Sequence, residues 1–406
     1  MTDPLKKLST IIMAGGKGER LFPLTRDKAK PVITFGGIYR ILDFTLSNCL
    51  NSGIRRIYVL SQYGSFSLDQ HLRQAWDIMH PDLGEYIYSM PPQQIMVNRW
   101  YRGTADSIYQ NLTILDQERP RQVLILSGDH VYKMNYLEMM DFHLSQDADL
   151  TVAAVMVPRI EGSSFGILKV NEASEVENFL EKPKDPPGLP DNPDYSLVSM
   201  GVYIFKAEVL VGEVIKDAKK KTSKHDFGGD IIPQMVGRKK VFAYNFQDPV
   251  TKTPRYWRDI GLLDAYFKAH QDLLGAAPVF ELFDDEWPVR SRPQLLPPSK
   301  YICAGSHVTV EDSLIASGCV IEGAVQRSVL SPGVKVGAKA TISEAILWDG
   351  VEIGAGAQIK GAIIEEGVRV PPGFTIGLDP KRDAKRFHLT EKGVVVVPNN
   401  AVMEGN

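Results

Sequence analysis

A 17-residue repeat near the C-terminal end constrains the fold of this chain more than any other feature. Aliphatic residues recur at this period in three registers: Val336, Ile353 and Val370; Ile342, Ile359 and Ile376; and Leu330, Leu347 and Ile364. Within each period the aliphatic steps run 6, 5 and 6 residues, with glycine and other small residues between them. Three short faces per coil are typical of a hexapeptide β-helix. A β-sandwich, the alternative, holds no fixed residue period.

Before the repeat, up to about residue 275, apolar strand-like runs alternate with helical patterns. Strands are expected at 54–60, 122–129, 149–157 and 197–205, and helices at 43–52, 105–117 and 135–146. This alternation predicts an α/β domain with a mainly parallel, covered sheet. The proline-rich stretch 287–300 marks a boundary, so we predict a first domain over 1–286, a linker over 287–300, and a β-helix with a C-terminal tail over 301–406.

Charge and cysteine content exclude several classes of protein. The net charge of the 406 residues is −3, which gives no general attraction to nucleic acid or to an anionic membrane. Cys49, Cys303 and Cys319 have neither the spacing of a zinc site nor the even count of a disulfide framework. No leader pattern precedes the first domain, and no apolar run approaches the roughly 18 residues of a membrane span. We therefore expect a soluble cytoplasmic protein with neither nucleic acid nor membrane as a partner.

The segment MAGGKGER, residues 13–20, is a glycine-rich turn after a predicted strand. Gly15, Gly16 and Gly18 allow the backbone to turn sharply beside a ligand. The segment matches neither a P-loop nor the dinucleotide fingerprint, which would need a third glycine where Leu21 stands. Arg20 and Lys30 follow on the same loop, and a nucleoside triphosphate needs such cations. The alternative is a pair of solvated surface cations.

Two aspartates are candidate metal ligands. Asp129 follows the apolar strand QVLIL at its carboxyl end, and Asp259 follows the aromatic residues of YWRDIG. Magnesium takes one or two carboxylates together with water and phosphate oxygens, although aspartates in such places also serve as helix caps or turn residues. His130 and His225 have no metal-ligand spacing, and we expect them to form structural hydrogen bonds.

The segments FLEKP and WYRGTADS are candidates for substrate contact. Lys182 could hold a phosphate and Glu181 could accept hydrogen bonds from sugar hydroxyls; the alternative is an exposed ion pair. Trp100 and Tyr101 could line a sugar or a base, or could simply pack.

Taken together, these segments resemble the bacterial ADP-glucose pyrophosphorylase (glucose-1-phosphate adenylyltransferase) family. The matching segments are AGGKGERLFPLT with AKP, FGGIYRILDF, LSNCLNSGIRRI, WYRGTADS, SGDHVYKMNY, FLEKP, SMGVYIF, HDFGGDIIP, YWRDIG and DAKRFHLTEKGVVVV. The resemblance runs from about residue 10 to the end, and WYRGTAD, SGDHVY and YWRDIG are its most specific parts. It implies a Rossmann-like nucleotidyltransferase domain with a mixed sheet, a left-handed parallel β-helix after it, and a homotetramer.

The resemblance also implies a reaction and a set of site residues. The expected reaction is Mg²⁺-dependent transfer of AMP from ATP to α-glucose 1-phosphate, giving ADP-glucose and pyrophosphate for glycogen or a related glucan. By position, Asp129 matches the catalytic metal-binding aspartate and Asp259 its companion. Residues that match the triphosphate loop are Gly15, Gly16, Gly18, Arg20 and Lys30, of which Arg20 and Lys30 are also expected to assist catalysis. Residues expected around glucose and its phosphate are Lys182, Glu181, Tyr101, Gly166 and Ser199.

The resemblance further implies regulation by phosphorylated metabolites or nucleotides. Arg40 matches a family effector arginine, and Arg382 and Arg386 keep the C-terminal end basic. Several bacterial members carry a lysine–arginine pair just before AKP, whereas this chain has Asp27 and Lys28. A carboxylate there would repel a sugar phosphate, so the identity of the activator stays open.

Three alternative functions are left open. One is a pyrophosphorylase that uses UTP or dTTP, and another is a non-catalytic regulatory subunit. The third is an acyltransferase on the β-helix, which generally needs a histidine base near the coils, and residues 308–387 contain none.

Overall fold

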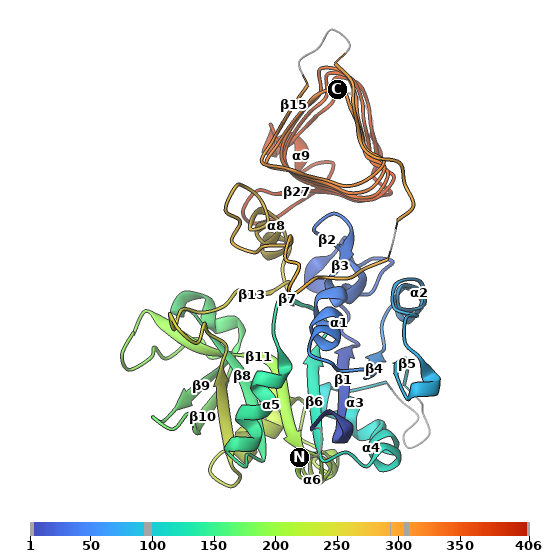
Figure 1. The fold of residues 1–406 in the computed structure, drawn as a ribbon. Coiled ribbons are helices and arrows are strands. Elements are labelled where there is room, and N and C mark those ends of the chain that lie inside the picture. Colours follow the sequence, from blue (N-terminus) through green and yellow to red (C-terminus); the bar gives the residue numbers. More distant parts are fainter. Residues whose placement is uncertain (1–3, 93–99, 293, 304–307, 404–406) are drawn as a thin grey trace.

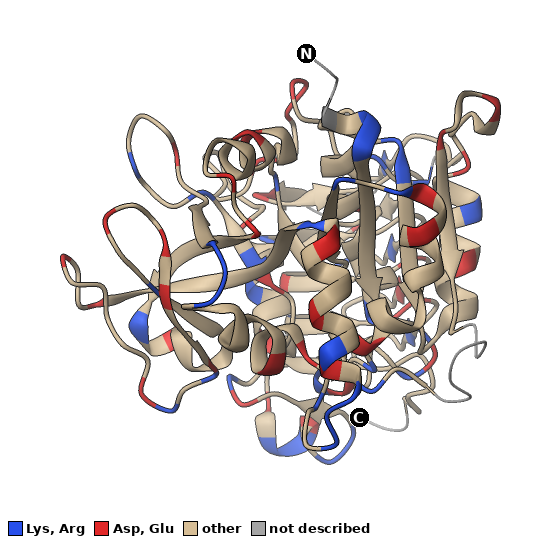
Figure 2. Cartoon of the chain, turned by 90° about the horizontal axis from the view of Figure 1, so that it is seen from below, with Lys and Arg blue, Asp and Glu red and all other residues tan. Residues whose placement is uncertain are grey.

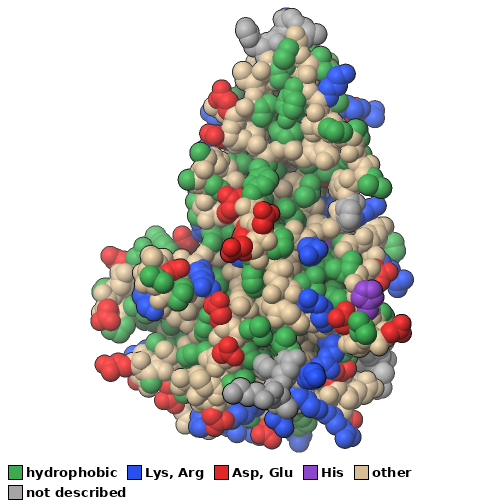
Figure 3. All heavy atoms as spheres, viewed as in Figure 1, with side chains coloured by type: hydrophobic (Ala, Val, Ile, Leu, Met, Phe, Trp, Pro, Cys, Tyr) green, Lys and Arg blue, Asp and Glu red, His purple; other side chains and the backbone are tan. Residues whose placement is uncertain are grey.

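The chain folds into an α/β domain followed by a β-helix in the computed structural model, which describes residues 4–92, 100–292, 294–303 and 308–403. Figure 1 shows the β-helix as a triangular coil beyond the α/β domain. Between the two lie α8 (Leu263–Gln271) and the hairpin of β2 (Thr34–Phe35) and β3 (Tyr39–Arg40). In the space-filling view the β-helix is the narrower part, and charged side chains of both signs lie on the face shown (Figure 3). The predicted fold class is confirmed, whereas the boundaries at residues 286 and 301 remain predictions.

The central sheet has strand order β10-β9-β11-β6-β1-β4-β5, with β8 paired to β11 and β12 paired to β8. Its strands are β1 (Leu8–Ala14), β4 (Arg56–Ser61), β5 (Tyr86–Met90), β6 (Gln122–Ser127), β8 (Leu150–Pro158), β9 (Gly166–Val170), β10 (Val176–Glu181), β11 (Tyr195–Lys206) and β12 (Val241–Asn245). Strands β6, β1, β4 and β5 run parallel, but β11 is antiparallel to β6, β8 and β9. The predicted parallel arrangement is therefore found in the half of the sheet formed by β6, β1, β4 and β5, and the sheet as a whole is mixed.

Helices cover both faces of this sheet. They are α1 (Ile41–Asn51), α2 (Ser65–Ala75), α3 (Thr104–Gln110), α4 (Leu112–Glu118), α5 (Tyr136–Ser145), α6 (Ala207–Ala218) and α7 (Ile232–Met235). The helix α8 (Leu263–Gln271) lies instead at the junction with the β-helix, and α9 (Pro380–Asp383) lies between two strands of the β-helix domain. Neighbouring residues of β1 face opposite sides, since Ile12 packs in one apolar cluster and Ile11 in the other. Seen from below, charged residues lie mostly on the helices and loops around the strands (Figure 2).

One predicted helix is interrupted. The helix expected over 105–117 is divided at Asn111, whose side-chain amide donates to the Ser107 carbonyl at 2.8 Å and to the Tyr101 hydroxyl at 2.9 Å. Side-chain hydrogen bonds of this kind offer the backbone an alternative to a continuous helix.

The coils of the β-helix follow the predicted 17-residue period. Parallel pairing stacks Val336 on Ile353 and Val370, Ile342 on Ile359 and Ile376, and Leu330 on Leu347 and Ile364. Its strands are β14 (Lys300–Tyr301), β15 (Thr309–Glu311), β16 (Leu314–Ile315), β17 (Val320–Ile321), β18 (Ala324–Gln326), β19 (Val329–Leu330), β20 (Lys335–Val336), β21 (Thr341–Leu347), β22 (Glu352–Ile353), β23 (Gln358–Ile364), β24 (Arg369–Val370), β25 (Thr375–Ile376), β26 (His388–Leu389) and β27 (Val395–Val397). The repeated aliphatic residues fill one continuous core.

A shared apolar cluster joins the β-helix to the α/β domain. Phe44 and Tyr266 of the α/β domain pack with Ile346, Trp348 and Ile363 of the β-helix. Two short two-stranded sheets lie on the α/β side of this junction. One pairs β2 (Thr34–Phe35) with β3 (Tyr39–Arg40), and the other pairs β7 (His130–Tyr132) with β13 (Trp257–Asp259). None of the helices in the described ranges is long and apolar enough to cross a membrane.

Candidate active site

The glycine-rich loop begins where β1 ends, and its glycines serve different purposes. Gly18 has φ +68, and a Cβ there would lie 2.9 Å from Thr25 Cγ2, so both backbone and space require glycine. A Cβ on Gly15 would lie 3.2 Å from the Cβ of Gln62, whereas one on Gly16 would meet no protein atom within 4 Å. The open side of Gly16 leaves room for a ligand to approach the backbone.

Asp129 lies beside this loop because β6 runs next to β1. Gly128 follows β6, and its N–H donates to the Met13 carbonyl at 3.1 Å. A Cβ on Gly128 would lie 3.1 Å from Leu42 and 3.2 Å from Ile12, so the absence of a side chain lets the two strand ends approach. The next residue, Asp129, is thereby placed at the carboxyl end of the sheet, where ligands gather in open α/β folds.

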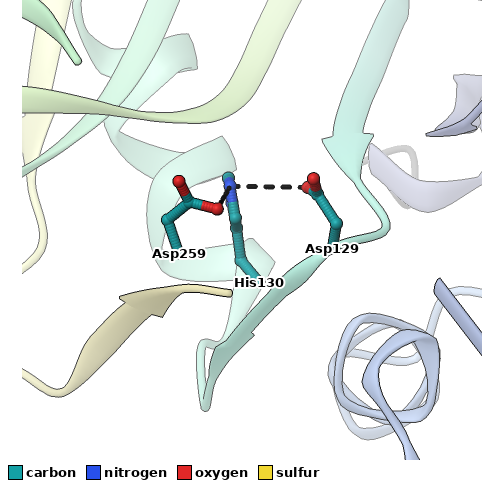
Figure 4. A group of neighbouring side chains, drawn as sticks. All are labelled: Asp129, His130 and Asp259. Carbon is teal, nitrogen blue, oxygen red and sulfur yellow. Dashed lines mark ion pairs between the residues drawn. The ribbon is translucent and has the colours of Figure 1, made fainter. Parts of the chain in front are cut away.

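Asp259 reaches Asp129 through the pairing of β7 with β13. These two strands are antiparallel, and their register sets Asp259 opposite His130. Figure 4 shows the His130 ring between the two carboxylates, with Nε2 at 3.4 Å from Asp129 and 3.7 Å from Asp259. One ligand atom from each of the three residues lies within 4.8 Å of the others. The sequence predicted structural hydrogen bonds for His130, which remains a prediction; the structure places its ring in this acidic group.

Lys30 completes this group. Its Nζ lies 2.6 Å from Asp129 Oδ2 and 3.5 Å from Asp259 Oδ1, and its side chain is 9% exposed. Burial alone would lower the pKa of Lys30, but the two carboxylates outweigh burial and raise it. Burial alone would raise the pKa of Asp129, yet Lys30, His130 and a hydrogen bond from Ser127 hold it well below its usual range. Lysine and aspartate are therefore both charged near neutral pH.

This donor set fits a divalent cation. Two carboxylates and an imidazole nitrogen, His130 Nε2, face one another at the carboxyl end of the sheet. Asp129 and Asp259 could act as ligands of a magnesium-like ion, which also takes water and phosphate oxygens. The ammonium of Lys30 already occupies the space between them, so the carboxylates are arranged around positive charge.

A cleft of about 390 Å³ opens on the glycine side of Asp129, and we call it the Gly16 cleft. It is lined by Met13, Gly15, Gly16, Leu60, Gln62, Tyr63, Tyr101, Arg102, Gly103, Thr104, Ser107, Ser127 and Asp129. Two of the lining residues are joined by a hydrogen bond, in which Gln62 Oε1 accepts from the Tyr101 N–H at 2.7 Å. Trp100 stacks on Tyr63 with ring centroids 5.8 Å apart. Aromatic and amide groups beside a glycine loop suit a nucleobase and ribose.

A second cleft of about 220 Å³ opens on the other side of Asp129, and we call it the Glu181 cleft. It is lined by Met13, Arg20, Thr104, Ser127, Asp129, His130, Ser164, Phe165, Gly166, Phe179, Glu181, Lys182, Ser199, Gly201, Tyr203, Asp226, Phe227, Gly228, Trp257 and Asp259. Lys182 has φ +46, a strained conformation for a lysine, and its ammonium pairs with Glu181 at 2.9 Å. Carboxylates, a lysine and hydroxyls suit a phosphorylated sugar.

Two glycines leave room for the carboxylate of Glu181. A Cβ on Gly228 would lie 2.5 Å from Glu181 Oε2, and one on Gly166 would lie 3.0 Å from the same oxygen and 2.3 Å from the Phe179 ring. Gly166 and Glu181 are also register partners in the β9–β10 pair.

The predicted site residues divide between these clefts. Gly15, Gly16 and Tyr101 line the Gly16 cleft, while Arg20 lines the Glu181 cleft with Gly166, Glu181, Lys182 and Ser199. Tyr101, expected near the sugar, is thus placed apart from the other four sugar candidates. Gly18 supports the loop, and Asp129 is shared by both clefts.

Sequence reasoning missed several residues that line the clefts. Thr104 lines both clefts, and its hydroxyl donates to Asp226 at 2.9 Å and accepts from the Phe227 N–H at 3.0 Å. His225 was expected to form structural hydrogen bonds, and it is buried and pairs with Asp217 at 2.6 Å. Its neighbour Asp226, which was not singled out, lines the Glu181 cleft. Gln62 has no signal in the single sequence.

The three candidate effector residues do not line one pocket. Arg40 lines a pocket of about 300 Å³ between the domains, together with Lys28, Arg292, Asp349 and Glu366. In this interdomain pocket Arg40 lies 3.6 Å from Asp349, and Lys28 pairs with Glu366. Arg382 lies in α9 and Arg386 stacks over Phe374, and neither is among the described lining residues.

The fold and the clefts define the class of this protein, and the comparisons agree. Residues 9–275 match the nucleotidyl transferase family, and residues 297–397 match the GlmU-like C-terminal hexapeptide family. The chain is therefore a nucleotidyl transferase with a hexapeptide β-helix.

Full-length relatives narrow this class. The glucose-1-phosphate adenylyltransferase of Koribacter versatilis is 46% identical over 392 residues, covering 95% of this chain and 94% of the relative. Glucose-1-phosphate adenylyltransferase 2 of Vibrio cholerae is 45% identical over 395 residues, covering 96% and 97%. The corresponding protein of Vibrio parahaemolyticus is 47% identical over 395 residues, covering 96% and 98%. The chain belongs to the glucose-1-phosphate adenylyltransferase family.

Proposed function

We propose that this protein transfers AMP from ATP to α-glucose 1-phosphate, releasing pyrophosphate and forming ADP-glucose. The observation that carries the proposal is the meeting of two chemically different clefts at Asp129. A nucleotide in the Gly16 cleft and a sugar phosphate in the Glu181 cleft would bring their phosphates together at this residue. Such positioning provides much of the catalysis of phosphoryl and nucleotidyl transfer.

The residues around Asp129 would assist the transfer by positioning and by neutralising charge. The phosphate oxygen of glucose 1-phosphate attacks the α-phosphorus of ATP in line, and the bond to pyrophosphate breaks. Lys30 and Arg20 would balance the negative charge that gathers on the phosphates. The N–H groups of the glycine loop, with the open side of Gly16, would receive the triphosphate. No covalent intermediate on the protein is needed.

We propose Mg²⁺ as the metal, held by Asp129 and Asp259. When bound, the ion would supply charge neutralisation on the phosphates. The carboxylates already surround a cationic group, and the oxygen donors suit Mg²⁺ more than a soft metal.

In the Glu181 cleft, different side chains would bind the phosphate and the sugar of glucose 1-phosphate. Lys182 would hold the sugar phosphate as a point charge. Glu181 would accept hydrogen bonds from the glucose hydroxyls, with Ser199 and the backbone of Gly166 beside it. Tyr101 is proposed to contact the nucleotide rather than glucose, because it lines the Gly16 cleft.

The wider setting is part of the proposal. We infer a homotetramer, regulation by phosphorylated metabolites or nucleotides, and a cytoplasmic location in which ADP-glucose feeds glycogen or another glucan. Arg40 supports an anionic effector at the interdomain pocket, and free Cys49, Cys303 and Cys319 suit a reducing compartment.

The test is pyrophosphate release from glucose 1-phosphate and Mg²⁺ with ATP, UTP, dTTP, GTP or CTP, each with and without a panel of glycolytic metabolites. We expect a strong preference for ATP and complete loss of release when the metal is chelated. Preference for UTP or dTTP would overturn the adenine assignment. No release with any nucleotide would favour a regulatory subunit.

A further inference from the structure

The candidate active site depends on two chain segments that are far apart in the sequence. One runs from Lys30 to Phe35, and the other runs from Asp259 into α8. Lys30 Nζ and Asp259 Oδ1 are 3.5 Å apart, so the position of one segment against the other sets this distance.

Tyr266 holds these segments together. It lies in α8, and its hydroxyl donates to the carbonyl of Thr34 at 2.6 Å. One turn further along α8, His270 Nε2 accepts from the N–H of Gly36 at 3.1 Å. Both Tyr266 and His270 are completely buried, so these hydrogen bonds do not compete with water.

Trp348 of the β-helix completes the hydrogen-bond chain. It directly follows β21, is 1% exposed, and donates its indole N–H to the Tyr266 hydroxyl at 2.9 Å. The Tyr266 hydroxyl carries a single proton. Because its oxygen accepts the hydrogen bond from Trp348, that proton is donated to the Thr34 carbonyl. Burial raises the pKa of Tyr266, which therefore stays protonated.

The β-helix contacts the Lys30 segment at a second point. Lys28, two residues before Lys30, pairs with Glu366 and lies 5.4 Å above the Trp348 ring. The β-helix thus contacts this segment on both sides of Lys30. Before Lys30 it contacts Lys28 directly, and after Lys30 it reaches Thr34 through the hydroxyl of Tyr266.

We propose that Trp348 is a positioning residue for nucleotidyl transfer, because its indole N–H orients the Tyr266 hydroxyl that fixes Lys30 against Asp259. This inference rests on the proposed function in taking Lys30 and Asp259 as groups at the reacting phosphates. It gives the β-helix a part in the geometry of the active site.

This chain of contacts from Trp348 through Tyr266 to Thr34, which we call the relay, predicts an effect on kcat rather than on the KM for glucose 1-phosphate. It includes neither β9 nor β10, which carry Gly166 and Glu181, so the KM for glucose 1-phosphate should stay within about two-fold. A small displacement of a group at the reacting centre chiefly lowers kcat, and we expect a fall of about ten-fold.

The test compares Trp348→Phe and Tyr266→Phe, each of which removes one hydrogen-bonding group and keeps a ring. We expect lower kcat in both, and a double variant no worse than the more affected single one, since both break the same chain of contacts. Ile363→Val is the matched control, because it loosens the same apolar cluster without touching the relay. An equal loss of kcat in Ile363→Val would overturn the proposal, as would normal kcat in Tyr266→Phe.

A second readout does not depend on activity. In the substrate-free protein, acetylation of Lys30 by acetic anhydride is followed by mass spectrometry, with exposed Lys169 as the internal reference. Lys30 should react faster in Trp348→Phe and Tyr266→Phe than in the wild type, and unchanged labelling would contradict the relay. If the wild type released no pyrophosphate with any nucleotide, the proposed function would fail while the labelling still decided the positioning. If Trp348→Phe does not fold, Tyr266→Phe decides, because it removes a single oxygen atom.

Discussion

The two clefts that meet at Asp129 are built in different ways. The Gly16 cleft lies at the carboxyl ends of the parallel strands β1, β4 and β6, and backbone, amide and aromatic groups line much of it. The Glu181 cleft lies where the antiparallel strands β9, β10 and β11 approach β13, and charged side chains provide many of its walls. The first suits a large, partly apolar nucleotide and the second a small, polar sugar phosphate. Changes in one cleft should therefore affect one substrate, and changes at Asp129 should affect the reaction with both.

The largest effect is expected at Asp129, the carboxylate that both clefts share. Asp129→Ala should lower kcat by at least about 10²-fold, because it removes a proposed metal ligand at the point where the two clefts meet. The midpoint of thermal unfolding should change little, since Lys30 keeps Asp259 as a partner. Asp116→Ala, which removes an exposed carboxylate of α4, is the control. Near-normal kcat at saturating Mg²⁺ would contradict the assignment.

Lys182→Ala should separate the two substrates. A hydrogen bond to a charged group contributes about 1.5–3 kcal/mol, so the KM for glucose 1-phosphate should rise about 10- to 100-fold while the KM for ATP stays nearly constant. Lys169→Ala, on neighbouring β9, removes an exposed lysine and serves as the control. An increase in the KM for ATP alone would mean that the two clefts have been assigned the wrong way round.

Gly228→Ala should give a smaller effect confined to the Glu181 cleft. The new Cβ would meet the Glu181 carboxylate, which lies at the end of a flexible side chain and can move, so the fold should tolerate the change. The KM for glucose 1-phosphate should rise by roughly three- to ten-fold, as expected for a partly weakened hydrogen bond. Gly212→Ala in α6 is the control, since its Cβ would meet no atom within 4 Å. Loss of stability with an unchanged KM would show that Gly228 is needed for packing instead.

The smallest effect is expected outside both clefts. Asp27 is exposed beside Lys28, which lines the interdomain pocket. Asp27→Lys should strengthen activation by a phosphorylated sugar and leave the KM of both substrates unchanged, because it replaces repulsion by attraction. Titration of activity with the metabolite panel measures this. An unaltered activation curve would show that the position does not face the effector.

The sequence predicted the two parts of the molecule unequally. The register of the β-helix could be predicted from the 17-residue spacing, because Val336, Ile353 and Val370 stack on one another in the same way in successive coils. The position of Asp129 after its strand was also readable, since the strand is continuous and apolar. Its meeting with Asp259 was not, because that contact depends on the β7–β13 register across 130 residues.

The antiparallel half of the sheet and the Glu181 cleft were predicted mainly by family resemblance. Lys182 in a left-handed conformation and Gly228 against Glu181 are consequences of tertiary packing, which no local pattern specifies. For the same reason, Tyr101 was expected beside the sugar, whereas its hydrogen bond with Gln62 places it in the Gly16 cleft.

The measurement that tests the account most directly is a crystal structure of the protein with ADP-glucose and Mg²⁺. The account predicts adenosine in the Gly16 cleft near Gln62 and Tyr101, glucose against Glu181, and the diphosphate beside Asp129. Adenosine in the Glu181 cleft, or a diphosphate remote from Asp129, would contradict it.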